Sequence, residues 1–222
     1  MKLTLITNKN DALSGIARCE KELILRIKTK YHPEIYSIKD YPAPSKFKKY
    51  LNFVNSLIKN GGAKKKSRNH NGVLHLLDQQ LALLLNFITP KEKIAVTVYD
   101  FYSFYPKYNK NSGTIKRIQN MLANRGLKTA DYIITISDTV RNQAQQYLNI
   151  PKGKIFVMSL GVDHQIFKPI KVNRERLLDK YGIPANKKVI LYVGAEKIQK
   201  NFSALIEAFK LVCKNNKDII LV

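Results

Sequence analysis

Cysteine is scarce in this 222-residue sequence, which contains only Cys19 and Cys213. The two lie far apart and show neither metal-ligand nor C-x-x-C spacing, which argues against a thiolate metal site and against a structural disulfide. The four histidines also lack a ligand spacing with carboxylates or cysteines: His32, His70, His75 and His164. We therefore expect a protein of a reducing compartment that binds no metal ion.

Long hydrophobic runs are missing as well. After Met1 the apolar segment 3–6 gives way to polar residues at 8–11, so it is too short for a signal peptide or a membrane span. Hydrophobic residues still make up 45% of the chain, enough to build one full α/β core and part of a second. We therefore expect a cytoplasmic protein that does not span the membrane.

Acidic residues are few, and their scarcity gives the chain its charge. Against 39 Lys and Arg stand 16 Asp and Glu, for a formal net charge of +23. Such an excess favours polyanions or anionic surfaces as partners, although a general Lys and Asn bias of the source genome explains it equally well. Two stretches, 41–77 and 101–130, contain no acid, so much of the positive charge belongs to the first 130 residues.

Over residues 1–160 short apolar runs alternate with helical patterns, which predicts an α/β fold with a Rossmann-like, doubly wound and mostly parallel sheet. Strands are expected at 3–7, 34–37, 73–77, 94–98, 131–136 and 155–158, and helices at 16–28, 79–87, 114–128 and 139–148, with Ser137 as the N-cap of the last. A short helix at 174–181, strands at 189–194 and 218–222 and a helix at 202–214 predict part of a second such unit.

The turn-forming segment 161–169 marks a boundary between two domains. We expect a Rossmann-like N-terminal domain at 1–168, a linker with a short helix at 169–187, and the start of a second Rossmann-like domain at 188–222. Two strands and one helix do not enclose a core on their own. We therefore expect further chain to follow Val222 in the intact protein.

Four segments, in one order along the chain, resemble the family 4 glycosyltransferases, retaining enzymes of the GT-B fold. They are 14–18 with 22–23, 130–137, 150–155 with 161–163 and 167–169, and 191–194 with 200–201 and 205–209. A glycine loop after a strand is common in α/β proteins, so the ordered series carries the resemblance. The resemblance implies two facing Rossmann-like domains, with the acceptor bound mainly by the first and a nucleotide sugar mainly by the second. It also implies transfer of a hexose with retention of anomeric configuration, without a metal or another cofactor.

The resemblance assigns residues to the phosphates of the donor. Lys200 takes the place of the family's phosphate-contacting lysine, which would meet the negative charge that forms as the sugar-phosphate bond breaks. Gly15, where a strand leads into a helix, would let backbone N–H groups approach phosphate, and Lys197 would substitute loosely for the family's arginine. A solvated lysine and a glycine needed only for a tight turn are the alternative interpretations.

Tyr99 and Asp100 are the candidate catalytic residues. They lie where many family members carry His-Asp at a strand end facing the interdomain cleft, with the histidine contacting the donor sugar. Tyr99 replaces that histidine and still offers a hydroxyl, and Asp100 would orient the neighbouring loop or the acceptor, with a plain turn aspartate as an equal alternative. The family's paired-glutamate motif lies beyond Val222, so we expect weak or no sugar transfer by these 222 residues alone.

Residues 45–59 form a basic amphipathic pattern, followed by a charged loop at 61–68. Several relatives dock on anionic membranes through a basic surface of this domain, so the resemblance implies a glycan or lipid-linked acceptor reached at the inner face of the membrane. An ordinary helix buried on one face, with solvated lysines, is the alternative interpretation. The lysines of this candidate surface are Lys46, Lys48, Lys49, Lys64, Lys65 and Lys66.

Two functions of other classes stay open. A nucleic-acid-binding protein would explain the charge and the basic aromatic segment 101–110, although no RNA-recognition, zinc-finger or helix-turn-helix pattern is present. A non-catalytic remnant or partner subunit would explain the end at Val222. Salt-sensitive RNA binding would favour the first, and a natural stop codon the second.

Overall fold

The structure, a computed structural model, describes residues 2–8, 14–38, 52, 72–102, 113–196 and 198–222. The chain divides into two compact units, Met1–Gly161 and Val162–Val222. The domain limits expected from the sequence stay predictions. Within the described ranges, no helix is both long enough and apolar enough to cross a bilayer.

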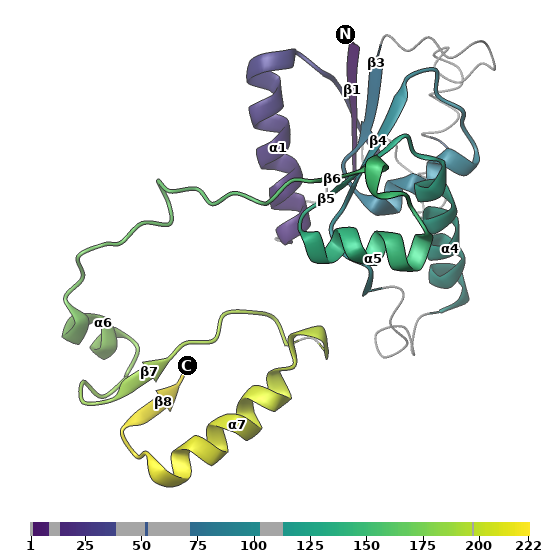
Figure 1. Ribbon diagram of the computed structural model, residues 1–222. Helices are drawn as coiled ribbons and strands as arrows, with labels where there is room; N and C mark the ends of the chain where they lie inside the picture. Colours follow the sequence, from purple (N-terminus) through teal and green to yellow (C-terminus); the bar gives the residue numbers. More distant parts are fainter. Residues whose placement is uncertain (1, 9–13, 39–51, 53–71, 103–112, 197) are drawn as a thin grey trace. The chain divides into compact units, whose positions relative to one another are not determined.

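The first unit is built on a six-stranded sheet in which every neighbouring pair is parallel (Figure 1). The strand order is β2-β1-β3-β4-β5-β6. Its strands are β1 (Lys2–Thr7), β2 (Glu34–Ser37), β3 (Gly72–Leu76), β4 (Lys93–Val98), β5 (Tyr132–Thr135) and β6 (Ile155–Val157). The predicted Rossmann-like parallel sheet is therefore confirmed.

Helices follow the strands in alternation, as the sequence predicts. They are α1 (Gly15–Tyr31), α4 (Thr114–Thr129), α5 (Asp138–Leu148) and two 3-10 helices, η2 (Gln79–Asn86) and η4 (Lys152–Lys154). Ser137 caps α5 as expected, because its side chain accepts a hydrogen bond from the Val140 N–H. The helix expected at 79–87 is a 3-10 helix: Leu81–Leu85 are all buried, so no stripe with a 3.6-residue period favours an α-helix there.

The two faces of the sheet differ in chemistry. Parallel crossovers are right-handed, so α1, which leads from β1 to the outer strand β2, covers the face opposite to η2, α4 and α5 (Figure 1). On the second face, Ile6, Leu76 and Val96 are fully buried in register beside the apolar side chains of η2 and α4. On the α1 face the buried side chains include Thr7, which donates to Glu20 of α1, and His75, whose Nε2 lies 2.8 Å from the Thr97 hydroxyl.

Helices η2 and α4 approach each other at a glycine. A Cβ placed on Gly126 of α4 would lie 1.8 Å from the carbonyl oxygen of Ala82 in η2. Only a residue without a side chain allows this spacing. The close contact holds η2 against α4, and η2 begins at Gln79, just beyond the carboxyl end of β3.

The second unit contains α6 (Arg174–Lys180), β7 (Lys188–Ile190), η5 (Ile198–Lys200), α7 (Phe202–Asn215) and β8 (Ile219–Leu221), with β7 and β8 paired in parallel. The two strands are shorter than the sequence predicts. Arg174 ties α6 to the segment before β7, since its guanidinium donates to the carbonyls of Ala185 and Lys187, both at 2.8 Å.

Candidate functional site

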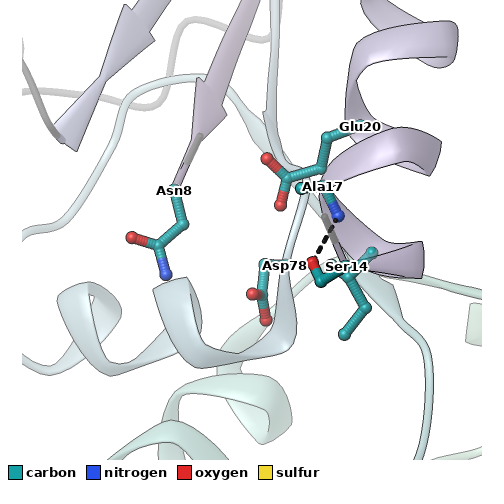
Figure 2. Close-up of a pocket in the computed structure, with 6 residues that line it drawn as sticks. Asn8, Ser14, Ala17, Glu20 and Asp78 are labelled. Atoms are coloured by element: carbon teal, nitrogen blue, oxygen red, sulfur yellow. Dashed lines mark hydrogen bonds between the residues drawn. The ribbon is translucent and has the colours of Figure 1, made fainter. Parts of the chain in front are cut away.

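A small polar cavity opens at the carboxyl edge of the sheet, between β1, the start of α1 and the start of η2. Its volume is about 90 Å³. Figure 2 shows the carboxylates of Glu20 and Asp78 reaching into the space between Asn8 and Ser14. The six lining residues are Asn8, Ser14, Ile16, Ala17, Glu20 and Asp78.

The strand order explains why a cavity forms here. From β1 the chain crosses to β2 on one side, whereas from β3 onward it crosses in the other direction. The connections therefore diverge above the carboxyl ends of β1 and β3, and such a switch point is where open α/β sheets bind ligands. Asn8 follows β1 directly and Asp78 lies just beyond β3, so both edges of the cavity are set by the topology.

Glu20 is the most unusual residue of the cavity. It is 2% exposed, and one of its carboxyl oxygens accepts a hydrogen bond from the Thr7 hydroxyl. Burial raises the pKa of Glu20 to about 7, with the nearby Asp78 acting in the same direction, while hydrogen bonds from Thr7 and the Asn8 backbone act against the shift. A carboxyl group of this kind can exchange a proton near neutral pH.

The sequence analysis missed Glu20, although a pattern in α1 points to it. Ile16 and Ile24 lie four residues before and after it, and helix positions four apart share one face. Glu20 thus interrupts the apolar stripe that packs on the sheet. An acid in such a stripe is rarely buried without a role or a partner.

Asp78 forms the second wall of the cavity and caps η2. Its Oδ1 accepts a hydrogen bond of 2.8 Å from the Gln80 N–H. Burial raises the pKa of Asp78 above its ordinary value, the cap hydrogen bond opposes the shift, and the charge of Asp100 adds to it. The sequence analysis did not single out this residue.

Tyr99 and Asp100, the predicted catalytic pair, follow β4 at the same edge of the sheet. Tyr99 is 7% exposed, and burial, followed by the charges of Glu20, Cys19 and Asp78, raises the pKa of its hydroxyl far above the ordinary value. That hydroxyl therefore stays protonated and can donate a hydrogen bond. Burial also raises the pKa of Asp100, against hydrogen bonds from Tyr102 and Gln79.

The predicted donor residues fall into different parts of the molecule. Gly15 is the first residue of α1, next to the cavity, and the space around its Cα is open. Lys200 is exposed and ends η5 in the second unit. Lys197 and the six lysines of the candidate membrane surface (46, 48, 49, 64, 65 and 66) lie outside the described residues.

The arrangement suits a ligand that carries hydroxyl groups. The two carboxyl groups of the lining, with raised pKa values, offer hydrogen-bond donors and acceptors, whereas ionised carboxylates would repel a phosphate. Among the described residues, no group of three His, Cys, Asp or Glu side chains is placed to hold a metal ion.

Comparison with known proteins shows which family the chain is similar to. Residues 73–166 match the sequence model of Glycosyltransferase Family 4. This segment is therefore similar to glycosyltransferase family 4. The family segment runs from β3 to beyond β6 and contains Asp78, Tyr99 and Asp100. No curated protein sequence matches the chain.

Solved structures share the fold of this chain at low sequence identity. HepE from Anabaena in complex with UDP and glucose has a TM-score of 0.62 at 15% identity, covering 100% of this chain and 60% of HepE. HepE in complex with UDP-glucose gives 0.63 at 14%, covering 100% and 59%. Sucrose-phosphate synthase from Thermosynechococcus elongatus gives 0.55 at 13%, covering 100% and 70%. The chain thus spans about 60% of the length of HepE.

Proposed function

We propose that this chain belongs to a retaining glycosyltransferase that moves a hexose from a nucleotide sugar to a glycan or lipid-linked acceptor. The observation that carries the proposal is the family 4 segment at 73–166, which includes the carboxyl edge of β3 and β4 with Asp78, Tyr99 and Asp100. The HepE structures, which share the fold, hold UDP with glucose or UDP-glucose, and this supports a nucleotide-sugar donor.

The second unit offers positive charge for the donor phosphates. Lys200 immediately precedes Asn201, whose φ of 50° ends η5 and starts α7. The N-terminus of α7 has no side-chain cap, and helix N-termini bind anions through their N–H groups and dipole. We assign the diphosphate to this place, where a lysine and a helix terminus stabilise the leaving group without a metal.

The first unit offers hydrogen bonds for sugar hydroxyls. Glu20 and Asp78 would accept from, or donate to, hydroxyl groups in the cavity, and the protonated Tyr99 would donate to one of them. Asp100 would orient this edge of the sheet. The phosphate role of Gly15 stays a prediction, and the two carboxyl groups beside it favour hydroxyls over phosphate there.

We place the enzyme in the cytoplasm, at the inner face of the membrane. The net charge of +23 supports attraction to anionic lipids. The lysines proposed for this contact lie outside the described residues, so vesicle binding tests the idea. Sedimentation with vesicles containing phosphatidylglycerol, compared with neutral phosphatidylcholine vesicles at the same ionic strength, would separate charge attraction from non-specific adsorption.

The first experiment is binding and turnover of nucleotide sugars. Calorimetry and product analysis with UDP- and GDP-linked hexoses would be carried out on the 222-residue chain and on the product of the longest open reading frame. We expect one donor to bind and to be hydrolysed or transferred, more slowly by the 222 residues alone. No binding of any donor by either protein would reject the proposal and favour a non-catalytic partner.

The phosphate site is tested by Lys200→Ala. Loss of one cation from a phosphate contact is expected to weaken donor binding about tenfold, because charged hydrogen bonds are worth about 1.5–3 kcal/mol. Lys210→Ala is the matched control, since Lys210 is an exposed lysine of the following helix α7 and pairs with Glu207 at 2.8 Å. Equal affinities of the two variants in calorimetry would remove Lys200 from the site.

A further inference from the structure

The carboxamide of Gln79 joins the beginning of η2 to the segment that follows β4. Its Oε1 accepts a hydrogen bond of 2.7 Å from the Tyr99 N–H, and its Nε2 donates one of 2.8 Å to the Asp100 carbonyl. The same nitrogen lies 3.4 Å from the Asp100 carboxylate. One side chain therefore holds two consecutive backbone groups of the predicted catalytic pair.

Those backbone groups lie just beyond the strand ladder. The last register pair of β4 joins Val98 to Thr135, so Tyr99 and Asp100 come after the end of the β4 pairing. On the far side Phe101 is buried and packs edge to face against Tyr147 of α5. Gln79 fixes the two residues between these anchors.

Gln79 is itself held firmly. It is the first residue of η2, directly after the Asp78 cap, and η2 is fixed in the core by the fully buried Leu81 and Leu84. A carboxamide is also the group that this place requires, because it has one accepting and one donating atom. Reversing the amide would set donor against donor and acceptor against acceptor, so the hydrogen bonds define its orientation.

We propose that Gln79 is a positioning residue of the glycosyl-transfer site. It acts through Tyr99 and Asp100, whose backbone it holds in the geometry needed to meet the donor sugar or the acceptor. The inference rests on the proposed function and adds to it a residue that the sequence analysis did not single out. Positioning groups matter because a misplacement of about 1 Å can cost about 100-fold in rate.

The test uses Gln79→Leu and Gln79→Glu, with Gln80→Leu as the matched control. Gln80 is the next residue and is likewise half-buried, but it contributes its backbone N–H to the cap. We expect Gln79→Leu to lower kcat about 10- to 100-fold, with KM changed less and Tm lowered by no more than about 4 °C. Gln80→Leu is expected to keep the kcat of the wild type.

Gln79→Glu provides a readout that a merely structural role would not move. The ionised side chain accepts from the Tyr99 N–H but cannot donate to the Asp100 carbonyl, whereas the protonated acid has both a donor and an acceptor. Its kcat, relative to wild type at each pH, should therefore recover as pH falls. A flat ratio between pH 5 and 8 would count against the proposal.

Two measurements separate this inference from the proposed function. If neither the 222-residue chain nor the product of the longest open reading frame turns over a nucleotide sugar, the proposed function fails, and hydrogen exchange at the Tyr99 amide still tests whether Gln79 holds this backbone. Faster exchange in Gln79→Leu but not in Gln80→Leu would support positioning. An unchanged Tyr99 exchange rate, an unchanged kcat, or a loss of kcat shared by Gln80→Leu would overturn it.

Discussion

Replacing Gly126 with alanine should lower the free energy of unfolding by about 3 kcal/mol, the upper part of the range for overpacking, because the added methyl meets backbone atoms. The added methyl would lie 1.8 Å from the Ala82 carbonyl oxygen and 2.6 Å from its carbon, both backbone atoms that cannot rotate away. Helices η2 and α4 would have to separate, which opens the apolar core between them. Alanine's better helix propensity, about 1 kcal/mol, offsets only part of this loss.

Urea unfolding followed by circular dichroism measures the effect. Gly153→Ala is the matched control, since Gly153 has open space around its Cα and does not adopt a positive φ. Its stability should stay within about 0.5 kcal/mol of wild type. Equal midpoints for the two variants would contradict the close approach of η2 and α4.

Replacing Glu20 with glutamine should stabilise the protein above neutral pH. The folded state raises the pKa of Glu20 from 4.5 to about 7, so it holds a proton that the unfolded chain releases at lower pH. Stability is therefore fully present below pH 4.5 and is lost as pH rises through 7. The difference between these two pKa values corresponds to a contribution of at most about 3 kcal/mol to the free energy of unfolding. Glutamine keeps an acceptor for the Thr7 hydroxyl but has no charge to bury.

His75 makes this prediction sharper, because its effect has the opposite sign. Burial lowers the pKa of His75 from 6.5 to about 4, so stability is lost as pH falls from 6.5 toward 4. In the wild type, Glu20 makes the stability fall and His75 makes it rise as the pH increases from 4.5 to 6.5, so the two contributions oppose each other. Glu20→Gln should therefore show stability that rises with pH over this range.

Urea titrations at pH 4.5, 6, 7 and 8 would measure both effects. The control is Glu22→Gln, a carboxyl two residues away that is partly exposed and lies 3.9 Å from Arg26. It should change stability by less than about 0.5 kcal/mol at every pH. A Glu20→Gln curve parallel to wild type would mean that Glu20 is not buried as described.

Periodicity was sufficient to predict the sheet. Runs such as 94–98 and 132–136 are mostly apolar and rich in β-branched residues, so their strand character is a local property. The helical form of η2 could not be predicted from the local sequence. The buried run 81–85 fits several helical geometries, and its packing against α4 decides among them. The position of Gly126 opposite Ala82 likewise depends on two segments that are far apart in the sequence.

The site was predicted only in part for the same reason. Tyr99 and Asp100 were predicted from the resemblance, because they lie where family members carry His-Asp, and the structure places them just after β4 at the carboxyl edge of the sheet. Glu20 and Gln79 act through partners on other elements, namely Thr7 of β1 and the Tyr99 backbone. Asp78 caps η2 locally, and its place in the cavity depends on the fold. Single-sequence patterns do not report such contacts, so these residues emerged only with the fold.

The unequal faces of the sheet separate what holds this domain together from what it recognises. Packing against η2 and α4 depends on apolar side chains such as Leu76 and Val96, and none of these borders the cavity. The hydrogen-bonding layer under α1 contains Thr7 and Glu20 instead. Substitutions in that layer could therefore retune ligand preference during evolution while the apolar layer stays untouched. A protein divided in this way can change the ligand that it binds while the packing that stabilises its fold is kept.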